Sequence, residues 1–349
     1  MRKNLSFLFV AVLSALFAFA FFFSMFESLS IVNKFLLNFF PYISLADEVH
    51  IQETTDFLRP VGYVAFGLTL VLILIGFVVR KGYLSAIGSV AFYLPIFGYF
   101  SFTMFFLVGI GAIRALWFPL IDFSPNLTLW LDMIVCLPWL ALPYQMVLYS
   151  GYFSLSISAA GAFIFFLGTL TWLHGKFKER QIVDFWIYRF SRHPQYLGFL
   201  LWGFGMLAFT VFFSRGYINE RYVPIPTPSF PWLVSMLTII AVALHEEIEM
   251  VRKHGDKYLD YRNHTPFMLP LPKFISALIT LPIEFFLKKK LPENRRELAY
   301  TILMYTSILL TYFILYIFIV FVVYRKTIFR LLRRKRPPTN ANHLAHHLR

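Results

Sequence analysis

Long apolar runs alternate with short polar stretches along the chain, and each long run predicts a helix that crosses a membrane. Five runs have the length that a helix needs to cross about 30 Å of hydrocarbon, namely residues 5–25, 61–79, 127–149, 152–173 and 298–324. Two more runs, 196–213 and 230–244, are at or below the shortest length that lets a helix cross the membrane. Because backbone groups in lipid must be satisfied within their own segment, this pattern predicts an all-α, polytopic integral membrane protein.

One stretch leaves the number of helices open. Residues 84–116 are largely apolar but hold Pro95, which removes a backbone donor from a helix interior. The stretch is consistent with one long helix kinked at Pro95 or with two short helices. We therefore expect about seven to nine membrane helices in all.

Composition and charge agree with lipid as the main solvent, since 58% of the 349 residues are hydrophobic and 14% are charged. The net charge of +14 could indicate nucleic acid, but basic residues flank the apolar runs as positive-inside anchors do. These flanking residues are Arg2, Lys3, Arg80, Lys81, Lys176, Lys178 and Arg180. The basic stretch 325–336 follows the last run directly, so we expect contacts with anionic lipid headgroups and no nucleic-acid partner.

Residues that commonly bind metals are scarce. Cys136 is the lone cysteine and lies in an apolar run, which rules out an internal disulfide and a cysteine-based metal site. His343, His346 and His347 follow a Pro-Pro pair in a polar tail, a composition typical of a solvated segment. We expect no metal.

The distribution of ionisable residues divides the chain into four parts. Residues 1–173 hold N-terminal membrane helices with few ionisable side chains, typical of a lipid-facing scaffold or of a wall around an apolar ligand. Residues 174–272 place Arg, His, Glu and Tyr beside apolar helices. Residues 273–324 begin with a short apolar piece that contains Pro282, which we predict to be an interfacial helix, and end with the last membrane helix. Residues 325–349 form a basic tail that faces the cytosol or the headgroups.

The first polar motif reads Arg192-His193-Pro194-Gln195-Tyr196-Leu197-Gly198 and predicts the start of a helix. Pro194 suits the first helical turn, where its missing N–H costs nothing. The free amides of that turn, together with Arg192 and His193, would form a positive site for an anionic group. Gly198 and Gly205 are spaced so that a second backbone or a flat ligand can approach the helix, and an ordinary interfacial anchor with small-residue packing is the alternative.

The second polar motif, His245-Glu246-Glu247, lies where the apolar run from Trp232 ends. Two adjacent carboxylates at a lipid boundary repel each other and lose hydration, so we expect cations or a ligand beside them. The alternative is a helix that simply ends in solvated charge. Gly255 predicts the end of this helix, and the spacing of Tyr258 and Tyr261 places them on one face of the next.

The chain between the two motifs is long enough for two short helices and the Pro-rich turn 223–231. Such a hairpin returns the chain to the face that it left. We therefore predict that Arg192-His193 and Glu246-Glu247 meet at one membrane interface, as the cationic and anionic walls of a single site that opens sideways to lipid.

The motif order over residues 191–272 resembles the isoprenylcysteine carboxyl methyltransferase and phospholipid methyltransferase group. The order is Arg-His-Pro-x-Tyr-x-Gly, Trp202-x-x-Gly205, Glu-Glu-Ile, a Gly, Tyr-x-x-Tyr and a Pro. The resemblance implies methyl transfer from S-adenosyl-L-methionine to a lipid or lipidated acceptor, with the active site at the cytoplasmic interface. It implies catalytic roles for Arg192, Glu246 and Glu247. It implies cofactor contacts at His193, Pro194, Tyr196, Gly198, Gly205, Glu246 and Glu247, and an acceptor site lined by Trp202, Tyr258 and Tyr261.

The acceptor and the rival functions stay open at this point. The carboxylate of a prenylated cysteine would lose its charge in the reaction, which a poorly hydrated site favours. An amine of a lipid headgroup would first have to lose a proton, for which Glu246, Glu247 or His245 could serve as base. The alternatives are an NADPH-dependent membrane reductase similar to the sterol reductases, and a non-enzymatic transporter or scaffold.

Overall fold

The computed structural model describes residues 2–43, 47–79, 81–96, 107, 109–123, 150–213, 216–218, 221–223 and 229–334. These residues are helical, apart from turns and one short antiparallel hairpin in which β1 (Gly216–Ile218) pairs with β2 (Arg221–Val223). The helical architecture expected from the apolar runs is therefore confirmed. Three helices of the described part are long and apolar enough to cross a membrane. The count of seven to nine membrane helices stays a prediction.

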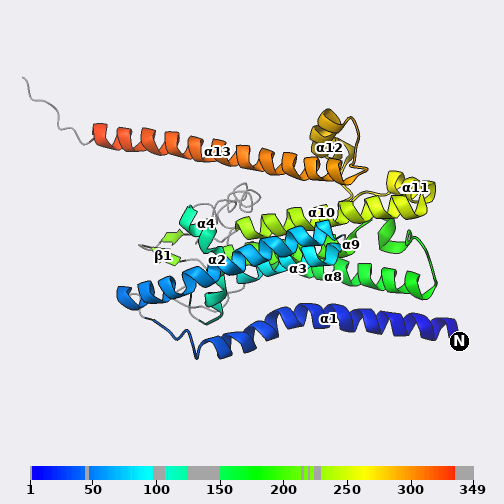
Figure 1. Cartoon of the computed structure of the whole chain (residues 1–349), viewed down its shortest axis with the longest axis horizontal. Helices are drawn as coiled ribbons and strands as arrows, with labels where there is room; N and C mark the ends of the chain where they lie inside the picture. The colour runs from blue at the N-terminus through cyan, green and yellow to red at the C-terminus, as the bar shows by residue number, and fades with distance from the viewer. Residues whose placement is uncertain are drawn as a thin grey trace, which may run out of the picture. The chain divides into compact units, whose positions relative to one another are not determined.

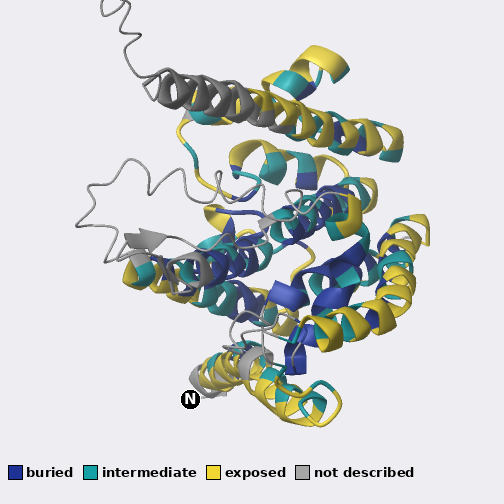
Figure 2. Cartoon of the chain, turned by 90° about the vertical axis from the view of Figure 1, so that its left-hand side faces the viewer, coloured by how far each residue is buried: buried dark blue, intermediate teal, exposed yellow. Residues whose placement is uncertain are grey.

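The chain forms two compact units, Met1–Leu298 and Ala299–Arg349. Three of the predicted spans lie in the first unit, in helices that extend beyond the apolar runs themselves. α1 (Arg2–Leu36) contains residues 5–25, α2 (Glu48–Val78) contains most of 61–79, and α8 (Ser150–Phe177) contains 152–173. Figure 2 shows the helix that begins at the N-terminus coloured largely as exposed, which fits apolar side chains that face lipid.

The stretch with Pro95 is not a single α-helix. α3 (Gly82–Tyr93) ends just before it, residues 94–96 form a 3-10 turn, and the 3-10 helix η2 (Gly109–Trp117) leads into α4 (Phe118–Phe123). The kinked-helix interpretation is therefore wrong. α3 lies against α2, because Gly76 leaves room for Ser85, whose hydroxyl donates to the Ile73 carbonyl at 2.7 Å.

The segment with the two polar motifs forms three helices, α9 (Pro194–Phe213), α10 (Ser229–His254) and α11 (Asp256–His264). α9 runs beside α8, and α10 beside α3 (Figure 1). A buried hydrogen bond from the Tyr93 hydroxyl to the Gly203 carbonyl, at 2.8 Å, ties α3 to α9. The first polar motif is thereby held on a helix that packs on two sides.

The C-terminal part begins with α12 (Lys273–Leu287), a 15-residue apolar helix with Pro282 inside it. α13 (Arg295–Arg334) follows and contains the predicted span 298–324 and most of the basic stretch after it. The start of α13 is capped, because Asn294 Oδ1 accepts from the Glu297 amide at 3.0 Å and Glu297 Oε2 accepts from the Glu293 amide at 2.7 Å. The predicted span 127–149 with Cys136, the anchor Arg80, most of the Pro-rich turn and the tail histidines lie outside the described residues.

Candidate functional site

The carboxylate of Glu247 is the centre of a buried ionic cluster. Its side chain is fully buried, and Arg192 Nε and His193 Nε2 each lie 3.1 Å from Oε1. Arg262 Nε lies 3.2 Å from the other oxygen, Oε2. Taking charges out of water is costly, so a carboxylate at this depth requires such partners. Three basic side chains from two separate segments supply them.

The start of α9 is positioned from both sides. The Arg192 amide donates to the Pro266 carbonyl at 3.0 Å, which fixes the residues before α9 against the segment after α11. Pro194 is the first residue of α9, as the sequence predicts, and the Leu197 amide donates to the His193 carbonyl at 2.9 Å. The backbone of Arg192 and His193 is therefore fixed by hydrogen bonds just before the first turn of α9.

A second, more open pair lies beside the buried cluster. The Tyr196 hydroxyl donates to Glu246 Oε1 at 2.6 Å, and Glu246 is exposed. The rings of His193 and Tyr196 are stacked at 5.7 Å, and Phe267 meets the His193 ring edge-on at 5.2 Å. The two acids are adjacent in the sequence but have different surroundings, because Glu247 is buried and Glu246 is exposed to solvent.

The cluster carries more positive groups than its one buried carboxylate balances. Arg192 and Arg262 both face Glu247, and the side chain of Arg192 is only 3% exposed. Arg192 Nη1 has no hydrogen-bond partner among the described residues. Burial lowers the pKa of the Arg192 guanidinium from its ordinary value, and the charge of Glu247 opposes that shift. An anionic group placed at Nη1 would satisfy both the charge and the hydrogen bond.

Tyr258 and Tyr261 lie on one face of α11, as their spacing predicts. Their rings meet edge-on at 5.8 Å, and the Tyr261 hydroxyl donates to the Tyr188 carbonyl at 2.8 Å. Burial raises the pKa of both phenols above the ordinary value, so each keeps its proton at neutral pH. This pair fastens α11 to η3 (Trp186–Arg189), the turn before the first motif.

The predicted contact between the two motifs is confirmed. Three other predicted site residues, Gly198, Gly205 and Trp202, contact parts of the chain outside the cluster. A Cβ at Gly198 would lie 2.5 Å from the Phe165 nitrogen, and one at Gly205 would lie 2.6 Å from the Ser154 carbonyl oxygen, both on α8. Of the two roles expected for these glycines, the structure shows the approach of a second backbone. Trp202 is 3% exposed and packs against Phe22 at 5.0 Å, within the apolar core.

Arg262 is the main residue of the cluster that sequence reasoning missed. It follows Tyr261 directly and belongs to no recognisable motif. Its Nη2 also donates to the Pro292 carbonyl at 3.3 Å, so one guanidinium joins Glu247 to the segment before α13. The signal in the sequence was the acid pair itself, because a buried carboxylate requires basic partners and Arg262 is one of the basic residues that follow the pair.

Replacing Arg262 with lysine is expected to lower the free energy of unfolding by about 1–3 kcal/mol, although the charge is kept. The guanidinium reaches Glu247 through Nε and the Pro292 carbonyl through Nη2, and the single nitrogen of an ammonium group lacks this fork. Unfolding of the purified protein in a detergent titration measures the change. Arg252→Lys is the matched control, because Arg252 is 66% exposed and pairs only at the surface with Glu249. Equal effects of the two substitutions would contradict a bridging role for Arg262.

The geometry joins buried cationic side chains, an exposed carboxylate and aromatic rings where the start of α9 meets α10 and α11. It can bind an anionic group at Arg192 and a cationic or hydroxyl group at Glu246 and Tyr196. Within the described residues, no group of three or more His, Cys, Asp and Glu side chains is arranged to hold a metal ion. The sequence matches no protein-family model, no curated protein and no solved structure.

Proposed function

We propose that the protein is an S-adenosylmethionine-dependent membrane methyltransferase that acts on a lipid or lipidated acceptor. The observation that carries this proposal is the convergence of Arg192 and His193 on Glu247, with Tyr196 on Glu246 beside it. These are the residues at which the resemblance to the isoprenylcysteine and phospholipid methyltransferases implies catalysis and cofactor binding. Three helices of the described part are long and apolar enough to cross a membrane, which suits an acceptor carried by lipid.

The residues present fit the groups of this cofactor. When bound, S-adenosylmethionine supplies an electrophilic methyl group on a sulfonium centre, and it also carries a carboxylate, an ammonium group and ribose hydroxyls. Arg192, with Nη1 buried and unpartnered among the described residues, would hold the carboxylate. Glu246 and Tyr196 offer an accessible carboxylate and a phenol for the ammonium or hydroxyl groups.

Glu247 and Glu246 have separate roles in this proposal. Both oxygens of Glu247 already face cations, so Glu247 positions Arg192 and His193 and does not take up a proton from the acceptor. If the acceptor is an amine, Glu246 is the accessible carboxylate that can receive its proton. If the acceptor is a carboxylate, no base is needed and exclusion of water by the surrounding apolar residues favours the loss of charge.

Calorimetric titration of the purified protein with S-adenosylhomocysteine tests the proposal. We expect binding, and we expect Glu246→Gln to weaken it about tenfold, because one charge-assisted contact is lost at an exposed position where folding is unaffected. Glu249→Gln makes the same chemical change three residues further along α10 and is expected to leave the affinity unchanged.

Supplying methyl-labelled cofactor to membranes then shows whether the label enters lipid, protein or a small molecule. Binding of NADPH without S-adenosylhomocysteine would favour the reductase alternative and overturn the proposal. Binding of neither, in a protein that remains folded, would favour the non-enzymatic alternative.

A further inference from the structure

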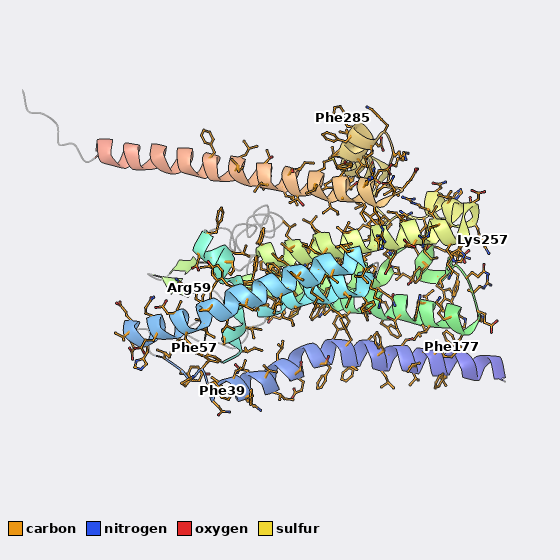
Figure 3. All side chains as sticks on the ribbon, viewed as in Figure 1. Phe39, Phe57, Arg59, Phe177, Lys257 and Phe285 are labelled. Carbon is orange, nitrogen blue, oxygen red and sulfur yellow. The ribbon has the colours of Figure 1, made fainter. Side chains whose placement is uncertain are left out.

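The helix α12 has an apolar face that nothing in the described structure covers. Phe274, Leu278, Leu281 and Phe285 recur at the spacing of one helical face, and each side chain is more than half exposed. Phe285 is labelled on this helix in Figure 3. Four large apolar side chains in a row on a water-facing surface would be costly. The face therefore requires an apolar partner.

The other sides of α12 are mixed in character, and they include the exposed Ile279 and Phe286. Ser276, Thr280 and Glu284 recur four residues apart and form a polar edge, in which the Thr280 hydroxyl donates to Glu284 Oε1 at 3.1 Å. Ile283 is 5% exposed and faces inward. The helix thus buries Ile283, is polar along one edge and is apolar over most of its exposed surface.

The helix is too short to cross a membrane. Its 15 residues cover about 22 Å at the usual helical rise, less than the roughly 30 Å of hydrocarbon in a bilayer. It ends at Lys288, whose backbone adopts the left-handed conformation that terminates a helix. A short amphipathic helix of this kind can lie along the membrane surface but cannot span it.

Basic residues follow the apolar face at once. Lys288, Lys289 and Lys290 are consecutive, and Lys288 Nζ lies 5.3 Å from the centre of the Phe285 ring. Lys289 is paired within the chain, with Glu293 and with Glu297 at 3.1 Å. Lys288 and Lys290 are exposed, which leaves their ammonium groups available for phosphate. An apolar face bordered by exposed lysines matches the boundary between acyl chains and anionic headgroups.

We propose that α12 docks on the surface of an anionic lipid leaflet. Phe274, Leu278, Leu281 and Phe285 enter the boundary between headgroups and acyl chains, and Lys288 and Lys290 bind lipid phosphates. This surface is separate from the ionic cluster around Glu247 and does not depend on the proposed methyl transfer.

Spin-label depth measurements in nanodiscs test this proposal. Labels are attached at Leu278→Cys on the apolar face and at Ser276→Cys on the polar edge, each in a Cys136→Ser background so that only one thiol reacts. We expect the label at position 278 to be reached by oxygen, which dissolves in lipid, several-fold more than by a water-soluble nickel chelate. The label at position 276 should show the reverse order.

The contribution of headgroup charge is measured by comparing phosphatidylcholine nanodiscs with nanodiscs that also contain phosphatidylglycerol. Anionic lipid is expected to move the label at position 278 deeper, and Lys288→Gln with Lys290→Gln is expected to abolish that shift. Lys253→Gln with Lys257→Gln removes the same charge at two other exposed positions and should leave the shift intact. The proposal would be overturned if the nickel chelate reached the label at position 278 more readily than oxygen does. It would also be overturned if contact with protein shielded this label from both reagents, or if its depth were the same with and without anionic lipid.

Discussion

Replacing Glu247 with glutamine is expected to lower the free energy of unfolding by about 3–5 kcal/mol and to abolish binding of S-adenosylhomocysteine. The substitution keeps the shape of the side chain but removes the one buried negative charge that faces Arg192, His193 and Arg262. Two guanidinium groups would then lie close together without compensation. A detergent unfolding titration measures the stability, and calorimetry below the unfolding midpoint measures the binding.

The control for this prediction is Glu249→Gln on the same helix. Glu249 pairs with Arg252 at the surface, where such pairs contribute no more than about 1 kcal/mol. Similar losses for the two variants would show that the cluster around Glu247 does not stabilise the fold. A destabilised but folded Glu247→Gln protein that still binds the ligand would separate the structural role of Glu247 from its role in the site.

Replacing Gly198 with alanine is expected to cost on the order of 3 kcal/mol, because the new methyl group has no room. Its Cβ would lie 2.5 Å from the Phe165 nitrogen and 2.6 Å from the Gly161 carbonyl oxygen, and backbone atoms cannot move aside as a flexible side chain can. α8 and α9 would have to separate. Since Arg192 and His193 directly precede α9, we also expect weaker ligand binding.

Gly67→Ala in α2 is the matched control, since a Cβ there meets no heavy atom within 4 Å. Alanine is the better helix former, so this variant should gain up to about 1 kcal/mol. Comparing the unfolding midpoints of the two variants tests the interface directly. A neutral result at Gly198 would mean that α8 and α9 are further apart than the structure has them.

The boundaries of the site helices could be predicted because the rules that set them are local. Proline is tolerated in the first turn of a helix, and α9 begins at Pro194. Glycine adopts a positive φ at a helix end, and Gly255 has a φ of 56° between α10 and α11. By the same kind of reasoning, the apolar runs predicted α1, α2 and α8 but underestimated their length. Polar residues at the ends of these helices continue the helix beyond the apolar region.

The composition of the site could be predicted only in part. That Arg192 and His193 meet the acid pair followed from the length of the hairpin and the cost of burying carboxylates. Which acid is buried did not follow, because Glu246 and Glu247 are adjacent and either could face inward. The rotation of α10 against its neighbours decides this, and it places Glu247 in the cluster and Glu246 at the surface.

The sequence by itself predicted apolar helices long enough to cross a membrane, the helical class and the two motifs that meet, because each depends on chain length, hydropathy or charge within a short stretch. Only the tertiary structure decided that Arg262 completes the cluster and that Gly198 and Gly205 serve the contact with α8. These facts depend on which side chains are brought together by packing of distant segments. A local sequence pattern cannot predict such contacts, because it shows which residues share one face of a helix but not which segment packs against that face.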